Sequence, residues 1–308
     1  MIHKRADERT WLPLLAAAAT GIFVGSTIVA TRFVIAQTTP ATLAFLRYAI
    51  GFCCLLPVTL LTNRRWFASR DLLPIALLGI TQFGILIALL NYGAQYIPAA
   101  RSALIFATMP LMTMILGAVL GHEEMTLAKT VGVLASIFGV ALALGGALRL
   151  GSTPQELWGA GAVLLGTLSG AVCSILYRPY LQRYPTLLVS TFAMAASVLF
   201  LALLAAGEGL FQQPLYFTSG GWLAVGFIGV SSGIGYYLWL WALNHAATTR
   251  VTIFLALSPV TATGLGALLL HESVSTTFGL GVACVVGGLW LAHRQPVQHT
   301  QPATHVIE

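Results

Sequence analysis

Apolar residues run in long stretches along this sequence, and short polar or proline-containing segments separate them. A transmembrane helix needs about 20 mostly apolar residues to cross the hydrocarbon core of a bilayer. Ten stretches meet this requirement and predict ten transmembrane helices, at 11–34, 40–62, 71–92, 98–120, 126–147, 156–178, 185–206, 220–242, 248–270 and 274–293. The predicted fold class is therefore an all-α polytopic membrane protein. The first stretch follows His3-Lys4-Arg5 and resembles a signal peptide, but the nine stretches behind it favour a retained helix.

Composition supports the membrane assignment. Of the 308 residues, 57% are hydrophobic and only 8% are charged, against about 25% charged residues in an average globular protein. A soluble enzyme or a disordered chain needs many charged and polar residues in contact with water, and this sequence has too few of them for either class. The net charge is +6, but the 15 Lys and Arg residues are scattered, so their placement is interpreted as a sign of membrane orientation and not of nucleic-acid binding.

The positions of Lys and Arg predict the orientation, because cytoplasmic loops are enriched in both. With the N-terminus placed inside, the inner segments hold Lys4, Arg5, Arg9, Arg64, Arg65, Arg70, Lys129, Arg178, Arg183, Arg250 and Arg294, and the outer ends hold Arg32, Arg101 and Arg149. Arg47 lies within a span. This asymmetry predicts that both termini are cytoplasmic.

The two halves of the sequence match at an offset of 149 residues. The matched pairs include Gly21 and Gly170, Gly84 and Gly233, Arg101 and Arg250, Pro110 and Pro259, His122-Glu123 and His271-Glu272, Gly132 and Gly281, and Gly139 and Gly288. One repeat contains five spans, an odd number, so the second copy is expected to be inverted in the membrane. The predicted units are a repeat over 1–150, a repeat over 151–293 and a disordered cytoplasmic tail over 294–308. Many secondary transporters have inverted repeats, with the substrate site between them near the bilayer midplane.

Each repeat has a proline in its fourth span, a His-Glu turn and a glycine-rich fifth span. In these features, carried by Met109-Pro110 through His122-Glu123 and by Ser258-Pro259 through His271-Glu272, the chain resembles the EamA family of the drug/metabolite transporter superfamily. Within that family it is most similar to the YddG-type amino-acid exporters. The resemblance implies a bacterial inner-membrane exporter with a central cavity between the two halves.

Small residues and prolines predict how the helices pack. Ala17, Gly21 and Gly25 on the first span, and Gly166, Gly170 and Ser174 on the sixth, have the spacing that lets helices approach closely in lipid. Pro110 and Pro259 fall near the middle of their spans, where proline bends a helix. Each is interpreted either as a fixed bend or as a hinge of the transport cycle.

Polar residues inside apolar spans are costly and so are candidates for a substrate cavity. The candidates in the first half are Arg47, Gln82, Asn91 and Tyr92, and those in the second half are Tyr177, Ser231, Ser232, Tyr236 and Trp239. Arg47 has two interpretations: it binds a substrate carboxylate, or it ties neighbouring helices together. Aromatic residues near span ends also form interfacial belts, which is the alternative role for Tyr236 and Trp239.

The sequence offers few groups for other chemistry. His122-Glu123-Glu124 lacks the second histidine of HExxH, because position 126 is Thr126. Capping by Glu123, Glu272, Thr126 and Ser275 is the preferred interpretation of these turns. The cysteines, at 53, 54, 173 and 284, have no metal-ligand spacing and are expected to be free and buried. No metal ion or other cofactor is therefore predicted.

The leading functional hypothesis is a secondary exporter of amino acids or similar small metabolites that works by alternating access. The chain has no P-loop, which argues against direct use of ATP. No acidic residue lies deep in a span, so proton exchange and facilitated diffusion both remain open. The alternatives are a phosphorylated-metabolite or drug transporter of the same superfamily, and an intramembrane enzyme is disfavoured because no nucleophile–base pair is evident. The expected partners are a small-molecule substrate and membrane lipid, with the protein a monomer or homodimer.

Overall fold

The computed structural model describes residues 11–62, 67–120, 126–149, 153–212, 215–246, 251, 253–271 and 275–293. Helices account for most of these residues, short irregular segments and turns connect them, and no β-strand occurs among them. The proposed tail 294–308, the His122-Glu123-Glu124 turn and Glu272 lie outside the described residues.

The first half of the chain contains nine helical segments. They are α1 (Leu12–Val34), the 3-10 turn η1 (Ile35–Gln37), α2 (Pro40–Thr62), α3 (Ser69–Gly79), the π-helical segment η2 (Ile80–Ile85), α4 (Leu86–Tyr96), α5 (Ala99–Phe106), α6 (Met109–Val119) and α7 (Leu127–Arg149). Segments α3, η2 and α4 are continuous, so they form one helical stretch from Ser69 to Tyr96.

The second half follows the same order. Its segments are α8 (Pro154–Leu176), α9 (Arg178–Arg183), α10 (Thr186–Gly207), α11 (Ser219–His245), the 3-10 turn η3 (Ile253–Ala256), α13 (Leu257–Leu270) and α14 (Thr276–His293). Ser275 caps α14, since its Oγ accepts a hydrogen bond from the backbone N–H of Phe278 at 3.2 Å.

Seven helical stretches of the described chain are long and apolar enough to cross a membrane, and they correspond to seven of the ten predicted spans. The remaining apolar segments are shorter, at Thr130–Gly139, Phe254–Leu270 and Thr276–Leu291. The structure therefore supports a multi-pass membrane protein, while the count of ten stays a prediction.

The outer surface of the bundle is apolar. Large aliphatic side chains on this surface are highly exposed, for example Leu61 (87%), Leu203 (75%) and Leu223 (76%). Ser and Thr hydroxyls are buried between the helices instead, as at Thr167, which is fully buried. This distribution is that of a protein whose surroundings are lipid. The cysteines are free, but Cys53 and Cys54 are exposed on α2, so the expectation that all four are buried was wrong.

The two halves of the chain pack against each other in a reciprocal way. A Cβ at Gly84 would lie 2.8 Å from Phe200 Cδ1, and a Cβ at Gly233 would lie 3.0 Å from Gly51 Cα. The two contacts are equivalent under the repeat: Gly84 corresponds to Gly233, and Phe200 corresponds to Gly51, each at the offset of 149 residues. The close approach of Gly139 to Gly281 and of Gly288 to Gly132 is reciprocal in the same manner.

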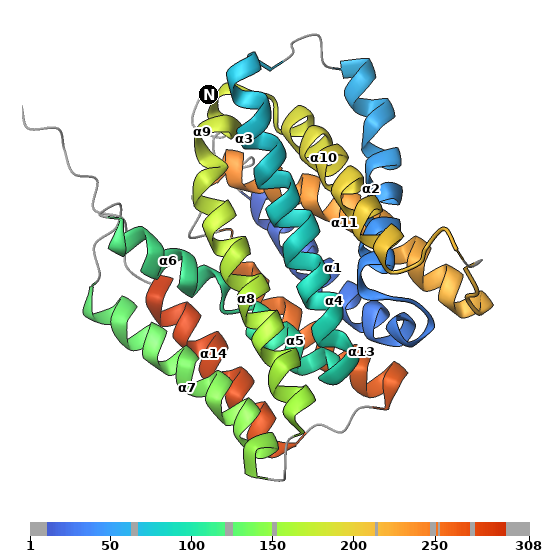
Figure 1. Ribbon diagram of the computed structural model, residues 1–308. Coiled ribbons are helices and arrows are strands. Elements are labelled where there is room, and N and C mark those ends of the chain that lie inside the picture. The colour runs from blue at the N-terminus through green and yellow to red at the C-terminus, as the bar shows by residue number, and fades with distance from the viewer. Residues whose placement is uncertain are drawn as a thin grey trace, which may run out of the picture.

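This pairing fixes the arrangement of the helices. Helices α7 and α14 run side by side at one edge of the molecule, and α2 and α10 pack together at another edge (Figure 1). Between them, α1 packs on α11 and α4 packs on α8, so several helices of each half contact helices of the other.

Glycines of α1 and α8 also allow close approaches between helices. A Cβ at Gly25 would lie 2.8 Å from Thr261 Cβ of α13, and a Cβ at Gly170 would lie 2.7 Å from Leu86 Cδ1 of α4. The expected role of these small residues in close packing is therefore seen in the structure.

The fourth span of the first half is interrupted in the middle of its length. Helix α5 ends at Phe106, Ala107 and Thr108 form a turn, and Pro110 occupies the first turn of α6. Proline is tolerated at that position because its missing N–H has no helical acceptor there. In the second half, the 3-10 turn η3 precedes α13, and Pro259 is the third residue of that helix.

Candidate functional site

An internal cavity of about 100 Å³ lies between the two halves of the bundle. One water molecule needs roughly 10–15 Å³ by the same measure, so the cavity has room for a small organic solute. Its walls come from α1, α2, η2, α4, α11 and the segments around Phe106, Met109 and Leu255. Both halves of the chain contribute, and the lining residues come mainly from the middle of their spans.

Six of the nine substrate-site candidates line this cavity. They are Arg47, Gln82, Ser231, Ser232, Tyr236 and Trp239. They come from three helical stretches that are far apart in the sequence, and the reciprocal packing of the repeats brings them together.

The other three candidates lie outside the cavity lining. Asn91 is buried and donates from Nδ2 to the carbonyl oxygen of Pro40 at 2.9 Å, at the start of α2. Tyr92 is 39% exposed, and its ring lies 5.0 Å from that of Tyr96. Tyr177 is buried in the hydrophobic core at the end of α8.

Arg47 is the cationic residue among the described residues that line the cavity. Its Nε donates to Ser232 Oγ at 2.6 Å, and its Nη2 donates to Thr27 Oγ1 at 3.4 Å. The guanidinium carbon also lies 5.7 Å from the centroid of the Tyr48 ring. These contacts link α1, α2 and α11 around one charge, so Arg47 has a structural role while part of its side chain still faces the cavity.

The π-helical segment η2 presents Gln82 and Phe83 to the cavity. A π-helix inserts one extra residue in a helical turn, and such segments are frequent at functional sites. The side-chain carbonyl oxygen Oε1 of Gln82 is buried and has no hydrogen-bond partner among the described residues. The Gln82 amide therefore has an acceptor available for a ligand.

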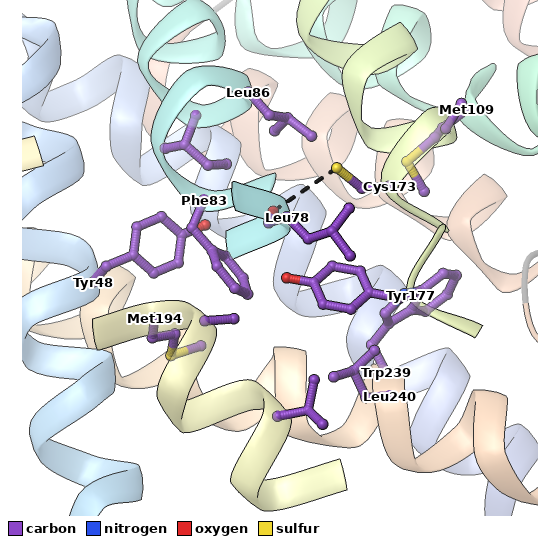
Figure 2. Close-up of a cluster of buried hydrophobic side chains, with 14 of the residues drawn as sticks. Tyr48, Leu78, Phe83, Leu86, Met109, Cys173, Tyr177, Met194, Trp239 and Leu240 are labelled. Atoms are coloured by element: carbon purple, nitrogen blue, oxygen red, sulfur yellow. Dashed lines mark hydrogen bonds between the residues drawn. The ribbon is translucent and has the colours of Figure 1, made fainter. Parts of the chain in front are cut away.

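A row of aromatic rings crosses the cavity wall from one repeat to the other. The Phe83 ring lies 4.9 Å from the Tyr48 ring and 4.3 Å from the Tyr236 ring. Figure 2 shows Tyr48 and Phe83 on one side of the buried cluster and Trp239 on the other, with Tyr177 between them.

Sequence reasoning missed several lining residues, namely Thr20, Phe23, Thr27, Tyr48, Phe83, Phe106 and Met109. Most of them are apolar and indistinguishable from core residues in an apolar span. Tyr48 was detectable, because it follows Arg47 directly and is a polar aromatic residue well inside a span. The hydroxyls of Thr20 and Thr27 each donate to their own helix, to the carbonyl oxygens of Ala16 and Val24.

A second polar cluster lies away from the cavity, where α2 ends and α3 begins. The Asp71 side chain is largely buried and accepts a hydrogen bond from the Tyr184 hydroxyl at 2.6 Å. Arg183 and Arg70 lie 3.8 Å and 4.0 Å from its carboxylate oxygens. The Tyr184 hydroxyl also accepts from the N–H of Ala68 at 3.1 Å. We call Asp71, Arg183 and Tyr184 the Asp71 cluster, and it ties the first half of the chain to the second.

Phe67 reinforces this cluster, because its ring lies 4.8 Å from that of Tyr184 and 5.0 Å from that of Phe192. At the opposite end of the bundle, Glu208 Oε2 accepts hydrogen bonds from the N–H groups of Ala41 and Thr42 at 2.9 and 3.1 Å. Both ends of the bundle are therefore held by polar contacts between the two halves.

The described residues contain no group of three or more His, Cys, Asp and Glu side chains that is positioned to hold a metal ion. The cavity chemistry is that of binding: one guanidinium, one amide, several hydroxyls and an apolar aromatic wall. No pair of described lining residues combines a nucleophile with a general base at hydrogen-bond distance.

The model of the EamA-like transporter family matches the chain twice, over residues 11–145 and 157–294. The chain belongs to the EamA-like transporter family. The double match agrees with the internal repeat, because each copy of the family model covers one half of this EamA transporter. The chain is thus a multi-pass membrane transporter of the drug/metabolite transporter superfamily.

Relatives of this EamA transporter cover 77% to 93% of its length. An uncharacterized transporter of Archaeoglobus fulgidus is 24% identical over 292 residues, which cover 93% of this chain and 99% of the relative. A probable terminal-alkyne amino-acid exporter of Streptantibioticus cattleyicolor is 30% identical over 240 residues, 77% and 78% of the two chains. The uncharacterized inner membrane transporter YedA of Escherichia coli is 27% identical over 286 residues, 90% of each chain.

A solved crystal structure has the same fold as this EamA transporter. It aligns with a TM-score of 0.67 and 23% identity, and the alignment covers 90% of this chain and 94% of the other. The alignment extends over both halves, so the arrangement of the two repeats is a property of the fold.

Proposed function

We propose that this EamA transporter exports amino acids or similar small metabolites across the bacterial inner membrane. The observation that carries the proposal is the cavity between the repeats, which combines Arg47, Gln82 and an aromatic wall in a space that fits a small solute. The relative in Streptantibioticus cattleyicolor, named as a probable amino-acid exporter, supports this substrate class. The resemblance to YddG-type exporters supports it as well.

The proposed mechanism is alternating access with two inverted five-helix repeats. The reciprocal contacts of Gly84 with Phe200 and of Gly233 with Gly51 support a pseudo-twofold axis between the repeats. In this mechanism, the Asp71 cluster at one end and the Glu208 contacts at the other open in alternation, and Pro110 and Pro259 serve as hinges where their helices begin.

The proposed orientation places both termini in the cytoplasm. It is supported by the excess of Lys and Arg on that side in the sequence. The Asp71 cluster then lies at the cytoplasmic end of the bundle, and the contacts of Glu208 lie at the outer end.

Two alternatives from the same superfamily fit the cavity less well. A phosphorylated metabolite needs several cationic groups around its phosphate, and Arg47 is alone among the described lining residues. A cationic drug needs a buried carboxylate, and no acidic residue is among the described residues of the lining.

Transport in reconstituted liposomes tests the proposal. The purified protein should accelerate the exchange of labelled amino acids between the vesicle interior and the medium, and protein-free vesicles serve as the control. Absence of flux for every amino acid in a panel would refute the substrate class. A parallel series with an imposed pH gradient separates the two energy sources, because facilitated diffusion predicts unchanged flux.

A further inference from the structure

The contacts of Arg47 leave its charge without a carboxylate partner among the described residues. Its two acceptors are the neutral hydroxyls of Ser232 and Thr27, and both hydroxyls donate their own proton to a helix carbonyl, of Ile228 and Val24. They therefore act on the guanidinium as acceptors that fix its position. Arginine has five N–H donors, so donors remain for a group that enters the cavity.

An unneutralised cation in the middle of a membrane protein is unfavourable, and such residues mark substrate or ion pathways. The matched position in the second repeat, 149 residues later, is Ala196. The cavity therefore presents one guanidinium on one wall and not a symmetric pair. One carboxylate, which binds a guanidinium through two parallel hydrogen bonds, is the complementary group.

Gln82 supplies a complementary group for a cation. The Oε1 atom of Gln82 is buried and without a partner among the described residues, and an amide carbonyl accepts hydrogen bonds from an ammonium group. The rings of Tyr48, Phe83 and Tyr236 lie in the same wall, and aromatic faces attract ammonium groups. This part of the cavity is thus suited to a single positive charge without a full carboxylate.

The remaining wall is apolar. Ile28, Leu86, Phe106, Met109 and Leu255 contribute to it, and none of these side chains can pair with a charge. A substrate group lodged there must be uncharged, because an unpaired charge in such surroundings is strongly disfavoured.

We infer that the site binds a zwitterionic α-amino acid with an uncharged, apolar side chain. Its carboxylate binds the Arg47 guanidinium, its ammonium group binds Gln82 Oε1, and its side chain lies against the apolar wall. This inference rests on the proposed function and narrows its substrate class, since acidic and basic amino acids would carry a second charge to a wall that has no partner for it.

The ligand series for the test consists of leucine, 4-methylpentanoate, which lacks the amino group, and 3-methylbutylamine, which lacks the carboxylate. Binding is measured by calorimetry on the purified full-length protein in lipid nanodiscs. Loss of a hydrogen bond to a charged group weakens binding by about 10- to 100-fold. Wild-type protein should bind leucine more tightly than either analogue by at least about that factor.

The variants assign each end of the ligand to one residue. Arg47→Gln should weaken leucine and 4-methylpentanoate by a similar factor and leave 3-methylbutylamine unchanged, and Arg47→Lys should restore part of the loss. Gln82→Leu should weaken the binding of leucine and 3-methylbutylamine and leave the binding of 4-methylpentanoate unchanged. Arg101→Gln is the matched control, because Arg101 pairs with Glu156 at 3.6 Å and does not line the cavity.

Equal binding of leucine and 3-methylbutylamine by wild-type protein would overturn the inference without any variant. Wild-type affinity for leucine in Arg47→Gln would also overturn it, while leucine flux in liposomes would leave the exporter function standing. Absence of both leucine binding and amino-acid flux in the wild-type protein would refute the proposed function together with the inference.

Discussion

Replacement of Tyr184 by phenylalanine tests whether the Asp71 cluster closes one end of the transport pathway. The substitution removes the hydroxyl that donates to Asp71 at 2.6 Å and accepts from Ala68 at 3.1 Å. It keeps the ring that packs on Phe67. A hydrogen bond to a charged group contributes about 1.5–3 kcal/mol, and Arg183 and Arg70 stay near the carboxylate.

We take a loss of about 2 kcal/mol from the lower half of that range, because Arg183 and water can partly replace the hydroxyl. If the cluster forms only in the closed state, this loss shifts the closed-to-open equilibrium by about 30-fold, since about 1.4 kcal/mol corresponds to a factor of ten. A minor open population would then become readily detectable.

The assay is a distance measurement between two spin labels across this end of the bundle. Ser69 and Gln182 are exposed and flank the cluster, one on each half of the chain. They are replaced by cysteine in a background from which the four native cysteines are removed. Tyr180→Phe is the matched control, because Tyr180 packs on the same core one turn earlier.

Tyr184→Phe should broaden the distance distribution toward longer values, and Tyr180→Phe should not. A purely structural cluster would instead lower the thermal stability of Tyr184→Phe while its distance distribution stayed that of the wild type. That combination would refute the closing role of the Asp71 cluster.

Three further changes have defined outcomes. Gly233→Ala should destabilise the protein by about 1–3 kcal/mol through overpacking against Gly51, whereas Gly226→Ala, with open space around its Cβ, should be neutral or stabilising in thermal unfolding. Glu208→Ala should cost about 1–2 kcal/mol because α2 loses the acceptor for its first N–H groups, and Glu208→Gln, which keeps an acceptor oxygen, should cost less in the same assay. Pro110→Ala and Pro259→Ala should slow transport per molecule more than they lower the unfolding temperature, and unchanged turnover with poor expression would contradict the hinge.

The repeat was predictable because residues of the two halves match at one fixed offset. The approximate spans were predictable because they follow from the length of the apolar stretches. The span predicted at 40–62 is helix α2 with the same bounds, since Pro40 and the polar run after Thr62 mark both ends. The interruption at Ala107 and Thr108 was not predictable, because both residues are compatible with an apolar helix.

Site residues were predictable where a polar side chain stood out in an apolar span. Whether such a side chain faces the cavity depends on the geometry of the helix. Gln82 and Asn91 are both polar positions of one stretch, but they are nine residues apart. At about 100° per residue, nine residues place two side chains on opposite faces, and Asn91 indeed turns to Pro40. Helical periodicity alone would have separated them.

Phe83 could not be identified as a cavity residue from the pattern of apolar positions. It is only 1% exposed and reads as an ordinary core residue, yet the π-helical segment sets it between the rings of Tyr48 and Tyr236. The extra residue of a π-turn leaves no trace in a pattern of apolar positions, so its effect on which side chains meet appears only in the structure.

The reciprocal packing of the two repeats affects the difference in free energy between the inward-facing and outward-facing forms. If the two repeats exchanged conformations, contacts between matched and identical residues would be lost at one end and re-formed at the other, with little net change. Unmatched positions would then set the resting preference, among them Arg47 against Ala196 and Asp71 against Gly220. A few asymmetric residues on a nearly symmetric frame can thus determine which side of the membrane the empty carrier faces.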